Sequence, residues 1–116
     1  GGWTYSDGRW QGFLGTPAID VVIDLGKTTS INNVEMSFMQ MKRTEVFLPS
    51  KVQVMLSNDG QTYDEVYSKD EPQEDTENPL YRTHKWKGHK KARYVHVKVE
   101  KSTFGGFVMC DEIIIR

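Results

Sequence analysis

From residue 19 onward, hydrophobic and polar residues alternate along most of the chain, and this period of two is typical of half-buried β-strands. The alternation is clearest in residues 19–25, 31–40, 51–57 and 92–99. The residues that it assigns to the buried faces are Val21, Ile23, Leu25, Val34, Met36, Phe38, Val52, Val54, Leu56, Val95, Val97 and Val99. Gly26 is expected to end the first of these strands.

Turn residues separate the predicted strands. Asp59 and Gly60 lie between two of them and tolerate the positive φ angles of a type I′ turn, so a β-hairpin is expected here. The segment DEPQEDTENP, residues 70–79, holds two prolines and five acidic residues and is expected to be a solvated loop. Further strands are predicted over residues 81–87 and 110–116.

The strand pattern sets the fold class. No useful window has apolar residues at helical spacing, and no repeat of fixed period occurs. About seven or eight short strands joined by turns predict an all-β protein, an antiparallel β-sandwich or jelly roll with its loops gathered at two ends. The length of 116 residues fits a single domain, residues 1–116. Because binding residues concentrate on loops, function is expected at one of these ends.

Composition and charge narrow the classes of partner. The net charge of −1 provides no bulk attraction to nucleic acid or to an anionic membrane, and no run is long and apolar enough to span a membrane. The segment KWKGHKKAR, residues 85–93, surrounds Trp86 with basic side chains, as polyanion binders do. A turn between two strands with edge lysines explains the segment more simply. No nucleic-acid partner is therefore expected.

Catalytic chemistry has little support in the sequence. The spacings of the serine-hydrolase elbow, the zinc protease helix, the P-loop, the Cys-x-x-Cys motif and the EF-hand do not occur. The lone Cys110 excludes an internal disulfide and is expected to be a buried, inert thiol. Five of the 16 acidic residues lie in residues 70–79, where solvation explains them without acid–base chemistry. The protein is not expected to be an enzyme.

Aromatic residues on the predicted loops form the strongest candidate site. Aromatic rings stack on the C–H faces of sugars, and a nearby guanidinium and carboxylate suit sugar hydroxyls. The candidate carbohydrate-binding residues are Trp3, Tyr5, Arg43, Glu45, Phe104 and Phe107. The alternative is that these rings close the ends of the sandwich or pack on another domain.

Several stretches carry a family resemblance: DGRWQGF, VVIDLGK, INNVEMSFMQ, PSKVQVMLSNDGQTYDEV, KARYVHVKVE and CDEIIIR. Together they resemble the coagulation factor V/VIII type C, or discoidin, domain, and in particular its carbohydrate-binding branch, the family 32 carbohydrate-binding modules. The chain is also similar to the C-terminal discoidin domain of chitobiases, the family 20 β-N-acetylhexosaminidases of gut Bacteroidetes. The resemblance runs from about Tyr5 to the end.

The resemblance implies a monomeric, non-catalytic module that directs an attached glycosidase to N-acetylhexosamine- or galactose-containing glycans, in the periplasm or at the cell surface. It implies a ligand site on the segment before Trp10 and on residues 41–47 and 102–108. It also implies that Trp10 and Phe13 belong to the core. A domain that packs on the catalytic domain of the same polypeptide without binding sugar remains the alternative.

A structural calcium ion is a further family property. Family members usually begin with an earlier strand and a DG loop that bind calcium together with a glutamate near the last strand. In this sequence Asp7 and Gly8 belong to the later DGRWQGF motif, so the first sheet is expected to lack a strand. Glu112 matches the glutamate without most of its co-ligands, and no cofactor is expected to be required. A membrane-inserting spike at residues 41–43 is the least favoured hypothesis.

Overall fold

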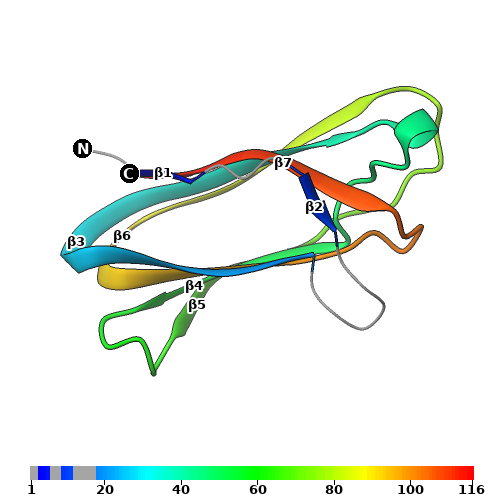
Figure 1. The fold of residues 1–116 in the computed structure, drawn as a ribbon. Coiled ribbons are helices and arrows are strands. Elements are labelled where there is room, and N and C mark those ends of the chain that lie inside the picture. The colour runs from blue at the N-terminus through cyan, green and yellow to red at the C-terminus, as the bar shows by residue number, and fades with distance from the viewer. Residues whose placement is uncertain (1–2, 6–8, 12–17) are drawn as a thin grey trace.

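The computed structural model describes the backbone of residues 3–5 and 9–11 and all of residues 18–116. Within these residues the chain is built of β-strands and one turn of 3-10 helix, η1 (Figure 1). The strands are β1 (Trp3–Tyr5), β2 (Arg9–Gln11), β3 (Ile19–Gln40), β4 (Lys51–Ser57), β5 (Asp64–Asp70), β6 (Leu80–Glu100) and β7 (Phe107–Ile115), and η1 spans Lys42–Thr44. The predicted all-β antiparallel architecture is confirmed.

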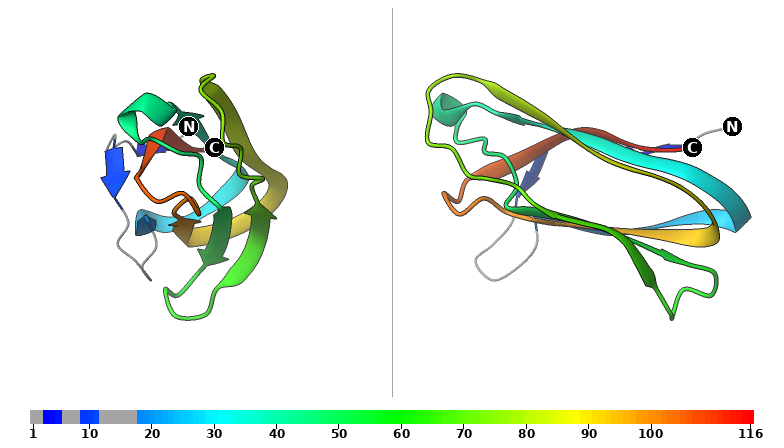
Figure 2. Two further views of the ribbon diagram at one scale, coloured as in Figure 1. Left: turned by 90° about the vertical axis from the view of Figure 1, so that its right-hand side faces the viewer. Right: turned by 180° about the vertical axis from the view of Figure 1, so that it is seen from behind.

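Two long strands hold the sandwich together. β3 and β6 have 22 and 21 residues, pair antiparallel and bend, so that each contributes to both layers (Figures 1 and 2). The first half of β3 pairs with the second half of β6, and β4 and β5 continue that layer. The second half of β3 pairs with the first half of β6 and with β7 in the other layer. β1 and β2 both pair with β7.

The bends correct two expectations from the sequence. Gly26 does not end a strand, because β3 continues to Gln40, and the glycine lies at an irregularity between Asp24 and Thr29. Its φ of 88° is a conformation that favours glycine and lets the strand turn into the second layer. Residues 85–93 likewise belong to β6 and do not form a separate turn. Each pair of predicted short strands is one bent strand.

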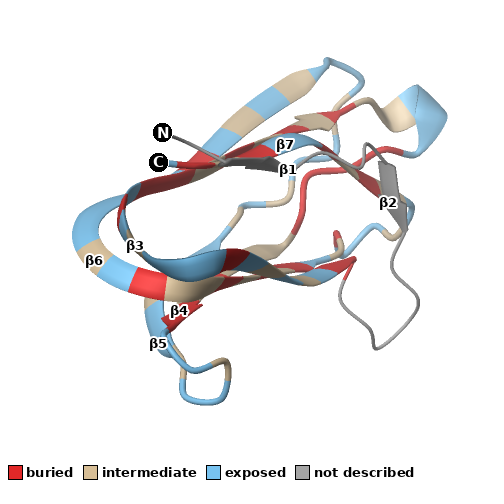
Figure 3. Cartoon of the chain, turned by 60° about the vertical axis from the view of Figure 1, so that its left-hand side comes forward, coloured by how far each residue is buried: buried red, intermediate tan, exposed pale blue. Residues whose placement is uncertain are grey.

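The core lies between the two layers, as Figure 3 shows from the distribution of buried residues. The residues assigned to buried faces in 34–38, 52–56 and 95–99 are all almost completely buried, and Leu25 joins them. Val21 and Ile23 are half-buried and pack against this core. Cys110 is also buried, and burial raises the pKa of its thiol to about 12, as expected for an inert cysteine.

The hairpin between β4 and β5 is confirmed, whereas its turn type is not. Residues 58–63 connect the strands, and Gly60 has a φ of 78°, but Asp59 does not take the positive φ that a type I′ turn requires. Instead, Asp59 Oδ1 accepts hydrogen bonds from the amides of Gln61 and Thr62 at 2.8 and 2.9 Å. The side chain of Asp59 therefore shapes a longer loop.

Two expectations near the N-terminus lie outside the described residues. β2 pairs Trp10 with Val108, but the side chain of Trp10 and all of Phe13 are not described, so their place in the core stays a prediction. No helix in the described part of the chain is long and apolar enough to cross a membrane.

Candidate functional site

Among the described residues, three loops meet at one end of the sandwich, opposite the end where β7 finishes (Figure 1). They are residues 41–50, 71–79 and 101–106, and we call this region the loop end. Two of them carry candidate residues named from the sequence. The structure shows how these loops are fastened to each other.

The first loop is closed by a short β-bridge between Met41 and Val46. The amide of Met41 donates to the carbonyl of Val46 at 2.8 Å, and η1 lies between the two residues. Glu45 then takes a left-handed conformation, with φ 58° and ψ 32°, and its amide donates to the carbonyl of Lys42 at 3.0 Å. This geometry leaves Arg43 and Glu45 exposed at the tip.

The loop of residues 101–106 is attached directly to this tip. The amide of Phe107 donates to the Glu45 carbonyl at 2.8 Å, and the amide of Phe47 donates to the Phe107 carbonyl at 2.9 Å. Gly106 has a φ of 68°, and a Cβ there would press against the Glu45 carbonyl oxygen. The close approach of the two loops therefore depends on glycine at this position.

Two phenylalanine rings pack against each other where these loops meet. Phe104 is 44% exposed, and its ring centroid lies 5.5 Å from that of Phe47, which is buried, with the planes tilted by 55°. The amide of Phe104 donates to Ser102 Oγ at 3.0 Å, which fixes the turn that carries the ring. Phe107 is half-buried at the start of β7. The loop end thus presents the exposed ring of Phe104, which packs on the buried ring of Phe47.

The acidic segment is irregular, as predicted, but it is not merely solvated. The Gln73 side chain accepts hydrogen bonds from Ser102 Oγ at 2.5 Å and the Thr103 amide at 3.0 Å. Its Nε2 donates to the Pro49 carbonyl at 3.1 Å. Gln40 Nε2 also donates to the Glu74 carbonyl at 2.7 Å. The side chain of Gln73 therefore connects all three loops, and the charge pattern of the sequence did not indicate this role.

Below the acidic segment lies a buried histidine, His84, which is 2% exposed. Its Nδ1 is 2.8 Å from the Tyr67 hydroxyl, and its Nε2 is 3.2 Å from Glu71 Oε1. Burial lowers the pKa of His84, although the neighbouring Glu71 carboxylate opposes this shift. These bonds anchor the start of the acidic segment to the sheet.

Charge at the loop end is mostly acidic. Lys42 Nζ lies 2.6 Å from Asp75 and 3.4 Å from Glu77, and the hydrogen bond to Asp75 raises its pKa. Within the described residues, the side chains of Arg43 and Glu45 make no ion pair. They are therefore available to a ligand, whereas Lys42 is held by two carboxylates.

The remaining candidate residues are placed elsewhere. β1 pairs Tyr5 with Ile113 and Trp3 with Ile115, so their backbone lies at the far end of β7, about 20 and 26 Å from Phe107 at the rise of ~3.3 Å per strand residue. The structure therefore does not bring these two positions to the loop end. Their side chains are not described.

An exposed aromatic residue at the loop end was missed from the sequence. Tyr81 is 66% exposed near the start of β6, where it pairs with Met39. The alternation in residues 81–87 places it on the same face as three polar residues, and that signal would have been sufficient to mark it as exposed.

Glu112, the candidate calcium ligand, is exposed near the C-terminal part of β7. It lines a small depression of about 130 Å³ together with Glu35 and Asp111. In residues 18–116 there is no group of three or more His, Cys, Asp or Glu side chains that could hold a metal ion. Glu112 as a ligand stays a prediction.

A protein-family model described as "F5/8 type C domain" matches residues 4–113 of this chain. No curated protein sequence matches it. The solved structures to which the chain is similar include CBM32-1 from a family 31 glycoside hydrolase of Clostridium perfringens. The two share 22% identity over 82% of this chain and 67% of that one, with a TM-score of 0.55.

Two further solved structures are similar to the chain. One is CpGH89CBM32-5 from Clostridium perfringens, in complex with GalNAc-β-1,3-galactose. It has 17% identity over 82% of this chain and 63% of that one, with a TM-score of 0.51. The other is chitosan-binding module 1 from a chitosanase/glucanase of Paenibacillus sp. IK-5, with 17% identity over 97% of this chain and 74% of that one and a TM-score of 0.54. At these identities the similarity shows the shared fold.

Proposed function

The chain belongs to the F5/8 type C domain family, and from this membership and the loop end we propose that it is a non-catalytic carbohydrate-binding module. The observation that carries the proposal is the exposed ring of Phe104, supported by the ring of Phe47 and close to the tip that bears Arg43 and Glu45. The module would direct an attached glycoside hydrolase to glycans that contain N-acetylhexosamine or galactose.

The chemistry of the loop end suits a sugar. The face of Phe104 offers an apolar surface for ring C–H groups, the guanidinium of Arg43 donates to hydroxyls, and the carboxylate of Glu45 accepts from them. A single shallow site buries little ligand surface, so the affinity for one sugar unit is expected to be weak, with a Kd of about 1 mM. Repeated units on a polymer would raise the apparent affinity.

The similar structures support the glycan class. One is bound to GalNAc-β-1,3-galactose and another is a chitosan-binding module, so hexosamines are part of both ligands. A third comes from a glycoside hydrolase, which supports an enzyme as the parent protein of this domain. A chitobiase parent and a location in the periplasm or at the cell surface are part of the proposal, as is the monomeric state.

Isothermal titration calorimetry tests the proposed site. The wild-type protein is titrated with N-acetylglucosamine, chitobiose, galactose, N-acetyllactosamine and a glucosamine oligomer. Phe104→Ala is expected to abolish binding, and Phe104→Tyr, which retains an aromatic face, is expected to retain it. Equal affinities for wild type and Phe104→Ala would show that this ring is not the platform.

A contact with the catalytic domain of the same polypeptide is the second candidate function. It is favoured by the two large side chains at the loop end, Phe104 and Tyr81, which are exposed in the structure of this chain. If this candidate is correct, no sugar in the panel binds, and Phe104→Ala lowers the melting temperature of the parent enzyme more than that of the isolated domain.

A further inference from the structure

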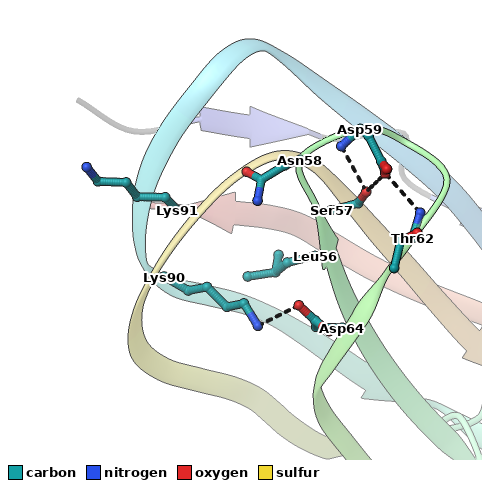
Figure 4. A pocket seen from close by; sticks show the side chains of 8 residues that line it. All are labelled: Leu56, Ser57, Asn58, Asp59, Thr62, Asp64, Lys90 and Lys91. Carbon is teal, nitrogen blue, oxygen red and sulfur yellow. Dashed lines mark hydrogen bonds and ion pairs between the residues drawn. The ribbon is translucent and has the colours of Figure 1, made fainter.

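A polar depression lies at the end of the sandwich opposite the loop end. β4 runs from Lys51, which pairs with Glu100 beside the loop end, to Ser57, which leads into the β4–β5 loop. The depression has a volume of about 200 Å³ and lies between this loop and the bend of β6 (Figure 4). It is smaller than the roughly 300–1,000 Å³ of sites for drug-sized ligands, and this size suits a single sugar ring.

The wall formed by the β4–β5 loop is preorganised. Ser57 Oγ donates to Asp59 Oδ1 at 3.0 Å and accepts from the Gly60 amide at 2.9 Å. The amides of Gln61 and Thr62, which donate to the Asp59 carboxylate, lower its pKa. Gly60 also lies against the ring of Tyr94. A ligand would therefore meet a loop whose backbone is already fixed, which reduces the entropic cost of binding.

The opposite wall is an ion pair. Lys90 Nζ lies 3.0 Å from Asp64 Oδ2, and this pair closes the lower side of the depression in Figure 4. An ammonium group has three donors and a carboxylate has further lone pairs, so both groups keep hydrogen-bonding capacity for a ligand. Leu56 lies beneath the depression and is 1% exposed, so recognition of a ligand falls to the polar groups of the walls.

Polar groups without partners face this space. The side chain of Asn58 points toward Lys90 across Leu56 in Figure 4, and Thr62 also lines the depression. Neither side chain makes a hydrogen bond within the described residues. An amide and a hydroxyl together offer donors and acceptors, and vicinal sugar hydroxyls need both.

We propose that this depression is a second sugar site, for one neutral pyranose unit that bonds to Asn58, Thr62 and the Lys90–Asp64 pair. The two lysines and two aspartates of the lining leave it without net charge, which favours a neutral sugar over a uronic acid. With sites at both ends of a molecule 43 Å long, the domain would bridge two glycan chains.

Chemical-shift titration of the ¹⁵N-labelled protein separates this site from the loop end. The ligands are methyl β-galactoside, methyl β-N-acetylglucosaminide and glucuronic acid. Saturable shifts are expected at the amides of Asn58, Gly60, Thr62 and Lys90 with a neutral sugar, and weaker ones with glucuronic acid. The amides of Phe104 and Gly105 report the loop end independently, so the failure of one site is distinguishable from the failure of the other.

Two variants and a matched control complete the test. Asn58→Ala and Thr62→Val each remove one hydrogen-bonding side-chain group and are expected to weaken binding at the depression by about three- to tenfold. Asn78→Ala makes the same amide-to-methyl change at an exposed position of the loop end and is expected to leave this affinity unchanged. The proposal is overturned if no neutral sugar shifts the depression amides, if the two variants bind as wild type does, or if glucuronic acid binds more tightly.

Discussion

Replacement of Gly106 by alanine is expected to lower the free energy of unfolding much more than the same replacement at the neighbouring Gly105. Both residues have a positive φ, 68° and 81°, so each substitution incurs a left-handed backbone cost of about 1–2 kcal/mol. A Cβ at Gly105 would meet nothing within 4 Å, so the conformational cost is the whole expected effect. Gly105→Ala is thus a matched control for backbone strain.

At Gly106 the added methyl group collides with the first loop. It would press on the Glu45 carbonyl oxygen and lie 2.9 Å from Cδ2 of the Phe47 ring. To make room, the loops must separate and lose the bonds from the Phe107 amide to Glu45 and from the Phe47 amide to Phe107. At about 0.5–1.5 kcal/mol for each bond, added to the backbone cost, we expect a total loss of about 2–5 kcal/mol for Gly106→Ala.

Urea unfolding followed by circular dichroism measures both variants against wild type. The midpoint is expected to fall with little change in the slope m, because the surface exposed on unfolding is nearly the same. In thermal unfolding, each kcal/mol corresponds to a shift of roughly 4 °C for a domain of this size. Equal losses for the two variants would refute the conclusion that contact between the loops, and not backbone conformation alone, requires glycine at position 106.

Three other predictions concern buried and connecting groups. Cys110 is expected to react with a thiol reagent at pH 8 only after unfolding, since its pKa is raised to about 12, and rapid labelling of the native protein would contradict this. The pKa of His84 is lowered below its ordinary value of 6.5, so the unfolded chain binds a proton first and the unfolding free energy falls as the pH drops below 6.5. Urea titrations at pH 7.5 and 5.5 should show that His84→Gln removes part of this fall, and an undiminished fall in the variant would contradict the role of His84. Gln73→Leu is expected to cost about 1–3 kcal/mol in urea unfolding, because several loop groups lose their partner, and the exposed Gln61→Leu should cost far less.

The sequence predicted the layers well because the signal for a half-buried strand lies in adjacent residues. The alternation in 34–38, 52–56 and 95–99 assigned each buried side chain correctly. The alternation did not show that β3 and β6 each continue through a bend as one strand. Gly26 was interpreted as a strand end, whereas in a bent strand the same conformational freedom allows the chain to turn between layers.

The candidate site was predicted less completely, because it depends on contacts between distant residues. The chemistry of Arg43 and Phe104 predicts a binding role, but the parallel bridge of Val46 with Phe107 that joins their loops follows from the fold as a whole. The role of Gln73 was not predictable from the sequence, because the acidic residues around it indicate only a solvated loop. Trp3 was grouped with these residues by type, although its strand pairs at the other end of β7.

A calorimetric titration of the wild-type domain and of Phe104→Ala with chitobiose and N-acetyllactosamine tests directly whether the loop end binds carbohydrate. Saturable, weak binding to the wild type is expected, with a Kd of about 1 mM. Phe104→Ala is expected to lose that binding, with the β-sheet circular dichroism spectrum unchanged. Unaltered binding in Phe104→Ala, or no binding to a folded wild type, would contradict a carbohydrate site at the loop end.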